Sequence, residues 1–245
     1  MEKRIFEKIN MNKQLINIKD QIEERSKDSR SNYLEKIKFS SEQSKSARDN
    51  MGCSNIAHAF ASCDKAQQNQ GASGGTVIGV VSAYNDMLSA HAPLKDYPDV
   101  IKNSSEKRNA IARVAGGVPA MCDGITQGEP GMELSLFSRD VIALSTAVAF
   151  SHNVFDAGIC LGVCDKIVPG LVIGALSFGH FPIAMLPAGP MPTGISNEEK
   201  SNNRKKYASG EIDRSALISS EQSAYHSSGT CTFYGTANTN QLIME

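Results

Sequence analysis

Three adjacent residues, Cys164, Asp165 and Lys166, offer the most chemistry in this sequence. A cysteine thiolate binds iron or zinc, a carboxylate binds a hard cation, and an ammonium group neutralises a carboxylate or a phosphate. A helix is predicted to begin just after Cys164, and its free N–H groups and dipole would favour the thiolate form. The same residues also fit a buried cysteine followed by a helix-capping aspartate, and their spacing leaves both interpretations open.

The other five cysteines stand at positions 53, 63, 122, 160 and 231. The first residues carry acids and no apolar run, so we expect no secretory signal, a cytoplasmic location and no disulfides. Cys231 lies 67 residues after Cys164, which is not a zinc-finger spacing. Cys160 is expected in the core, and Cys63 has no partner motif. The residues alone therefore predict a site of thiolates and carboxylates, without naming its ligand.

These residues must be positioned by an alternation of strands and helices. Continuous apolar, β-branched runs predict strands at residues 76–83, 112–121, 156–163 and 181–187, with helices at 91–103, 135–152, 167–178, from 197, and 211–225. This alternation predicts an α/β fold with a parallel sheet and helices on both faces. Ligands of such sheets bind beyond the carboxyl ends of the strands, where the turns hold Cys122, Asp123 and Cys164.

The first 50 residues hold 12 of the 25 Lys and Arg residues, nine acids and no Gly or Pro. Leu15, Ile18 and Ile22 lie at helical spacing, so we predict surface helices with a solvated charged face rather than a nucleic-acid arm. The polar, Gly-rich composition of residues 67–75 predicts a linker. We therefore expect an N-terminal helical segment and linker at 1–70 and an α/β domain at 71–245.

The overall composition limits the partners of the chain. Its net charge is −1, so no overall field attracts it to nucleic acid or an anionic membrane. No stretch approaches the roughly 18 apolar residues that a membrane span requires. We expect a small-molecule substrate, no nucleic acid and no membrane.

Longer motifs resemble one protein family. They are CDKIVPGLVIGA at 164–175, CDGITQG at 122–128, GMELSLFSR at 131–139 and SHN at 151–153. The sequence from Tyr84 onward resembles the dihydroxy-acid and phosphogluconate dehydratases. Within that family, SAYNDMLSAH at 82–91, LSFGH at 176–180, GTCTFYGTANTN at 229–240 and, more loosely, GCSNIAH at 52–58 resemble the phosphogluconate branch.

The resemblance implies a lyase that removes water from 6-phosphogluconate and gives 2-dehydro-3-deoxy-6-phosphogluconate, a reaction of the Entner–Doudoroff route. It implies that Cys164 and Cys231 bind an iron–sulfur cluster, and that the full-length protein is a homodimer. One iron of such a cluster must lack a cysteine ligand so that it can act as a Lewis acid on the departing hydroxyl group. His152 is expected either to cap the preceding helix or to contact substrate.

One departure from the family pattern bears on the cofactor. Diiron relatives carry a third cysteine in the turn after the first strand, whereas residues 87–91 read MLSAH. This difference favours a 4Fe–4S cluster and leaves the third ligand open, with Cys122 as the candidate and Cys53 behind it. Asp123, Asp165 and Lys166 match positions that hold Mg²⁺ in dihydroxy-acid relatives, where the lysine is carbamylated.

The resemblance also leaves two alternatives to a phosphogluconate-specific dehydratase. The substrate could be a dihydroxy acid of branched-chain amino-acid synthesis, which the missing cysteine near Ser89 argues against. The chain could instead be a metal-binding module without catalysis. Family members are much longer and carry a second, β-rich domain that supplies the proton-abstracting base. We therefore expect a truncated N-terminal domain, inactive by itself, with its catalytic base unknown.

Overall fold

The computed structural model describes residues 12–44, 48, 50–192, 194–231 and 235–245. The chain divides into one unit that ends at Lys45 and a second that begins at Ser46. The described part of the first unit is a single helix, α1 (Lys13–Ser44), in agreement with the predicted N-terminal helical segment. Leu15, Ile18 and Ile22 of this helix are each about half exposed. None of the helices described is long and apolar enough to cross a membrane.

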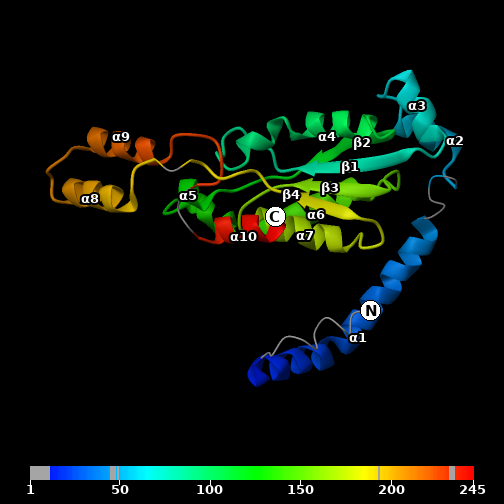
Figure 1. Cartoon of the computed structure of the whole chain (residues 1–245), viewed down its shortest axis with the longest axis horizontal. Coiled ribbons are helices and arrows are strands. Elements are labelled where there is room, and N and C mark those ends of the chain that lie inside the picture. Colours follow the sequence, from blue (N-terminus) through cyan, green and yellow to red (C-terminus); the bar gives the residue numbers. More distant parts are fainter. Residues whose placement is uncertain (1–11, 45–47, 49, 193, 232–234) are drawn as a thin grey trace. The chain divides into compact units, whose positions relative to one another are not determined.

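The second unit is built on a four-stranded parallel sheet (Figure 1). Its strands are β1 (Thr76–Ser82), β2 (Ala110–Gly117), β3 (Ala157–Leu161) and β4 (Ile183–Leu186), in the order β2-β1-β3-β4. Helix α4 (Tyr97–Glu106) lies on one face, and α6 (Ser138–Phe150) and α7 (Ile167–Leu176) lie on the other. The predicted parallel α/β fold with helices on both faces is therefore confirmed.

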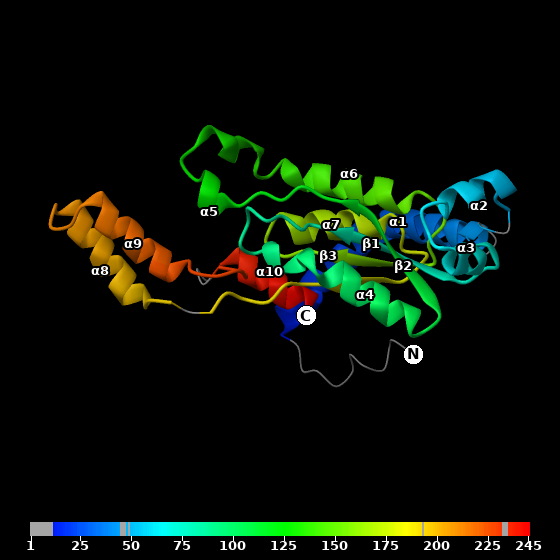
Figure 2. The same cartoon turned by 90° about the horizontal axis from the view of Figure 1, so that it is seen from above.

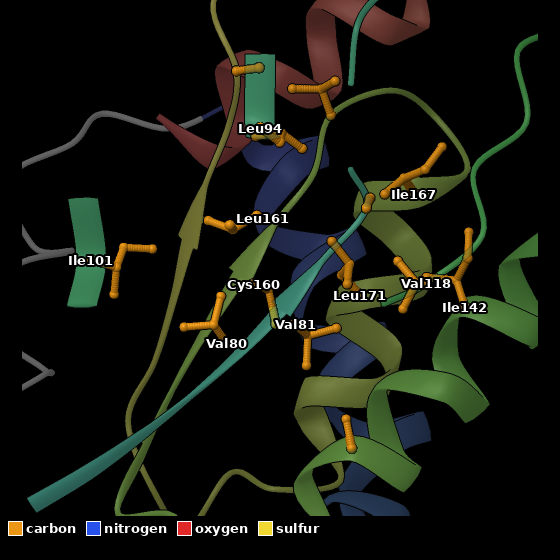
Figure 3. Close-up of a cluster of buried hydrophobic side chains, with 14 of the residues drawn as sticks. Val80, Val81, Leu94, Ile101, Val118, Ile142, Cys160, Leu161, Ile167 and Leu171 are labelled. Atoms are coloured by element: carbon orange, nitrogen blue, oxygen red, sulfur yellow. The ribbon is translucent and has the colours of Figure 1, made fainter. Parts of the chain in front are cut away.

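The core lies between the sheet and these helices. Val80 and Val81 of β1 point to opposite faces of the sheet, as successive strand residues must, and both are fully buried (Figure 3). Leu161, Ile167 and Leu171 are buried with them. The sheet is apolar on both faces because helices cover both, which is why its strands read as continuous apolar runs. The carboxyl ends of the strands are thereby held in place for the turns that follow.

Residues 67–75 are not the linker that their composition predicted. Helix α2 (Cys53–Ala59) is followed by α3 (Lys65–Ala72), whose N-cap Asp64 accepts a hydrogen bond of 2.9 Å from the backbone N–H of Gln67. Gly71 lies against the ring of Phe60, where a Cβ would come within 2.4 Å of a ring carbon. Phe60 in turn packs on Val77 and Ile111 of the sheet. A domain boundary at residue 70 remains a prediction.

The segment after β4 leaves the sheet and returns to it. Helices α8 (Asn197–Ala208) and α9 (Arg214–Ala224) lie side by side (Figures 1 and 2), and each begins at a side-chain N-cap. The ends of this excursion meet in a parallel bridge, where Met191 N–H donates to the Thr230 carbonyl at 2.8 Å and Thr230 N–H donates to the Gly189 carbonyl at 3.0 Å. The bridge brings Cys231 back beside the end of β4.

The remaining elements are short and lie near the turns. They are the 3-10 helices η3 (Ala92–Lys95) and η4 (Pro130–Leu134), and the α-helices α5 (Asp123–Thr126) and α10 (Thr236–Met244). Helix α5 directly follows Cys122, and α10 begins five residues after Cys231. Both cysteines therefore precede helices in the sequence.

Candidate active site

An ion-pair cluster joins the turns after β2 and β3. The ammonium nitrogen of Lys166 lies 2.5 Å from Oδ2 of Asp123 and 2.8 Å from Oδ1 of Asp165. The Lys166 side chain is 2% exposed, whereas the two carboxylates are partly exposed. The structure thus brings together the three residues for which the sequence suggested Mg²⁺ binding, at the carboxyl edge of the sheet where the fold class predicts a site.

Further hydrogen bonds fix the orientation of both carboxylates. The Ser135 hydroxyl donates to Oδ1 of Asp123 at 2.7 Å, and the Thr236 hydroxyl donates to Oδ2 of Asp165 at 3.1 Å. Arg139 donates to the backbone carbonyl of Asp165 at 3.2 Å. Every oxygen of the two carboxylates therefore has a donor, which allows two negative charges to sit beside a buried lysine.

The protonation states of the cluster follow from these contacts. Burial by itself would raise the pKa of Asp123, but the hydrogen bonds from Lys166 and Ser135 outweigh it and hold the pKa below its ordinary value of 3.8. Burial would lower the pKa of Lys166, but the hydrogen bonds to Asp123 and Asp165 outweigh it and raise the pKa above 10.5. In the metal-free chain the site therefore contains an ammonium group between two carboxylates.

We expect the Lys166→Met variant to lose about 2–4 kcal/mol of unfolding free energy in the metal-free chain at pH 7. Removing the cation leaves two carboxylates without their charged partner, and their partial exposure to water keeps the loss below that of a fully buried pair. Urea titration followed by far-UV circular dichroism measures this change. The matched control is Lys102→Met, which removes an exposed ion pair with Asp99 and should change stability by less than about 0.5 kcal/mol.

The pH dependence of the same comparison has a definite sign. The depressed pKa of Asp123 contributes stability above pH 3.8, and this contribution disappears as the pH falls through the lower pKa of the folded state. The raised pKa of Lys166 contributes stability that is lost only as the pH rises beyond 10.5. The difference between wild type and Lys166→Met should therefore be largest near neutral pH and shrink on acidification below 3.8. A difference independent of pH would contradict the ion-pair interpretation.

Three cysteines from separate turns lie around this cluster. Burial, together with smaller contributions from the nearby Cys122, Cys231 and Asp165, raises the pKa of the Cys164 thiol to about 12. The predicted stabilisation of the Cys164 thiolate by a helix dipole is therefore wrong for the metal-free chain. Negative neighbours and a low-dielectric surrounding outweigh the dipole, so a thiolate here requires added positive charge.

This donor set fits an iron–sulfur cluster. Cys122, Cys164 and Cys231 interact electrostatically, and a cluster would supply the positive charge that their thiolates need. Thr230, next to Cys231, is fully buried, and its hydroxyl has no partner among the described residues. Over the described ranges, no three His, Cys, Asp or Glu side chains are close enough together to hold a single metal ion.

The other candidate residues lie elsewhere. Cys160 is fully buried within β3, as expected of a core residue, and its thiol pKa is raised by burial to about 12. Cys53 is exposed in α2 and Cys63 is partly buried beside Phe60. His152 lies at the end of α6, where Nδ1 is 2.9 Å from the Ala149 carbonyl, so it caps that helix. A role for His152 in substrate binding stays a prediction.

Sequence reasoning missed three polar residues near the site: Ser135, Thr236 and His91. Ser135 and Thr236 lie within the family motifs, so the motifs were the available signal, but their partners are 12 and 71 residues away in sequence. His91 ends the motif at 82–91. It is 1% exposed, and burial lowers its pKa to about 4 despite a backbone hydrogen bond at Val163.

Comparison with known proteins identifies relatives of this arrangement. The profile of the dihydroxy-acid/6-phosphogluconate dehydratase N-terminal family matches residues 76–245. The chain is 53% identical to the phosphogluconate dehydratase of Escherichia coli K12 and 56% identical to that of Helicobacter pylori 26695, over 96% and 93% of its length. A dihydroxy-acid dehydratase of Akkermansia muciniphila is 32% identical over 69% of the chain and covers 31% of that relative. The chain spans 39% and 37% of the two phosphogluconate dehydratases.

Proposed function

Because the chain belongs to the dihydroxy-acid/6-phosphogluconate dehydratase family, we propose that it is the cluster-binding part of an iron–sulfur dehydratase acting on 6-phosphogluconate. The observation that carries the substrate assignment is the difference in identity between the two branches. Phosphogluconate dehydratases are 52–56% identical to the chain, whereas the dihydroxy-acid dehydratase is 32% identical over a shorter stretch. The turn at residues 87–91, which contains no cysteine, supports the same branch.

The proposed reaction is an elimination of water. A base removes the proton from the carbon next to the carboxylate, the hydroxyl group on the neighbouring carbon leaves, and the enol becomes the 2-keto acid. When bound, the cluster supplies Lewis-acid chemistry for the departing hydroxyl group. We assign the base to the part of the relatives that this chain does not match, so no residue of the chain is named as the catalytic base.

The proposed ligands of a 4Fe–4S cluster are Cys164 and Cys231, with Cys122 as the third. Cys122 is favoured over Cys53 because its charge influences the Cys164 thiol, whereas no such influence of Cys53 on that thiol is seen in the described structure. With three cysteine ligands, one iron would be left for the substrate oxygen. Cys160 is excluded by its place in the core.

The carboxylate pair has a separate proposed role. Asp123 and Asp165 would bind Mg²⁺, a cation that prefers carboxylate oxygens, and would thereby orient the acid end of the substrate. Lys166 in its ammonium form would oppose a second cation between the same carboxylates. Loss of a proton from the ammonium group, followed by reaction of the amine with carbon dioxide to a carbamate and release of a second proton, would convert the positive charge into a negative ligand.

Anaerobic reconstitution with iron and sulfide tests the cofactor assignment. We expect about four irons and four sulfides per chain and the absorption of a 4Fe–4S cluster. Addition of 6-phosphogluconate should change the electron paramagnetic resonance spectrum of the reduced cluster, because substrate oxygen binds the iron without a cysteine ligand. A branched-chain dihydroxy acid should leave that spectrum unchanged.

The other outcomes assign other functions. A spectrum that changes with the dihydroxy acid and not with 6-phosphogluconate would indicate a dihydroxy acid as the substrate. A cluster that responds to neither would favour a metal-binding module without catalysis, and failure to bind iron would refute the cofactor. Cytoplasmic location and a homodimer of the full-length protein remain predictions.

A further inference from the structure

One turn contacts the backbone immediately before each of two cysteines. This turn, Leu88 to His91, follows β1. The N–H of Gly229, two residues before Cys231, donates to the Ser89 carbonyl at 2.7 Å. Nε2 of His91 lies 3.2 Å from the carbonyl of Val163, the residue before Cys164. The two contacts therefore join the turn to both segments that the proposed function assigns to the cluster.

The turn itself is rigidly held. Leu88, Ala90 and His91 are 2%, 8% and 1% exposed, so two apolar side chains and one imidazole anchor it in the core. Its chain is closed by hydrogen bonds from the N–H groups of His91 and Ala92 to the Leu88 carbonyl, at 2.9 and 3.0 Å. Segments with buried anchors and local hydrogen bonds open less readily than exposed loops, so this turn is fixed relative to the core.

Both cysteine segments contain a residue with a positive φ. Cys164 has φ of 75°, a left-handed conformation that a residue with a side chain rarely adopts. Gly229 has φ of 130°, and a Cβ at this position would come within 2.5 Å of the Met191 nitrogen. A strained residue such as Cys164 persists when the surrounding contacts fix it. The turn at 88–91 supplies one contact beside Cys164 and another at Gly229.

The hydrogen bond at Val163 also defines the state of His91. A carbonyl oxygen only accepts, so Nε2 must carry the hydrogen and Nδ1 is a bare acceptor. Nδ1 is buried and has no partner among the described residues. A buried polar atom without a partner costs free energy, so packing by itself would favour an apolar residue at position 91. The hydrogen bond that Nε2 donates to the Val163 carbonyl explains why a histidine stands at this position.

We propose that the turn at 88–91 is a clamp that sets the relative positions of Cys164 and Cys231. In this clamp His91 is the positioning residue for Cys164, and the Ser89 carbonyl, through Gly229, positions Cys231. The turn would thereby hold both cysteines in place without itself contributing a cysteine. The clamp rests on the proposed function for its purpose, but its geometry can be tested without any cluster.

The test is alkylation of the metal-free chain with iodoacetamide, with the rate at each cysteine read by mass spectrometry. His91→Leu should raise the rate at Cys164 about tenfold, the effect of losing one hydrogen bond, and leave Cys231 within about twofold. Gly229→Ala should do the reverse, because its Cβ would clash with the backbone of Pro190 and Met191 and displace the segment before Cys231. His91→Gln keeps an N–H near the position of Nε2 and should restore slow labelling of Cys164.

Two cysteines serve as internal controls. Cys160 is 0% exposed in β3 and reports opening of the whole domain, and the exposed Cys53 reports the intrinsic rate of the reagent. The proposal is overturned if His91→Leu accelerates Cys160 together with Cys164, if it accelerates neither, or if His91→Gln behaves like His91→Leu. If each variant accelerates alkylation only at its own cysteine, but the chain does not bind iron, the clamp is supported and the proposed cofactor is refuted.

Discussion

The Cys164→Ser variant should bind no iron–sulfur cluster after anaerobic reconstitution, whereas the wild-type chain should bind about four irons. A serine hydroxyl is not ionised at neutral pH and is a hard, weak ligand for the cluster irons. The substitution keeps the side-chain shape and leaves the backbone at φ of 75° unchanged, so the fold should persist. Iron and sulfide analysis with the visible absorption spectrum measures the loss, and far-UV circular dichroism checks the fold.

Variants of the other cysteines separate ligands from bystanders. Cys231→Ser should lose the cluster as completely as Cys164→Ser. Cys63→Ser is the matched control, because it removes one partly buried thiol beside Phe60 and should retain the full iron content. Cys122→Ser decides the third ligand, and we expect it to bind less iron than the control. Full iron binding by Cys164→Ser would refute the assignment of this residue.

The parallel sheet could be predicted because its strands obey a simple local rule. Runs such as residues 77–81 are continuously apolar, a composition typical of strands covered on both faces. Helix α3 was missed for the opposite reason. Its residues are polar and include Gly71, which local rules interpret as a loop, while the stabilising contact with the Phe60 ring joins residues 11 apart in sequence.

The candidate site shows the same division between local and tertiary information. The strand-end rule placed Asp123 and Lys166 at one edge of the sheet, and the structure pairs them at 2.5 Å. The hydroxyl donors and the His91 contact come from distant segments, and no local pattern predicts such pairs. The protonation of Cys164 was mispredicted because a helix dipole is visible in sequence, whereas burial and neighbouring thiols are not.

Phe150 is a core residue whose side chain should contribute strongly to the stability of the fold. This residue ends α6, is 2% exposed, and has Phe155, Phe178 and Phe181 around it at ring-centroid distances of 6.3, 5.8 and 5.8 Å. We expect Phe150→Ala to lower the free energy of unfolding by about 3–5 kcal/mol, the range for a large aromatic side chain removed from a core. The chain has no tryptophan, so far-UV circular dichroism in urea is the measurement.

A double-mutant cycle with Gly158 tests whether the ring itself causes this loss. A Cβ at Gly158 would come within 2.8 Å of the Phe150 ring, so Gly158→Ala alone should destabilise the chain by about 1–3 kcal/mol through overpacking. In the Phe150→Ala background the ring is absent, and the added methyl group can occupy part of the cavity. The double variant should therefore be at least about 1 kcal/mol more stable than additivity predicts.

Phe137→Ala, at a position 59% exposed, is the control and should cost less than about 1 kcal/mol. Additive effects in the cycle would show that α6 does not pack on β3 through this ring.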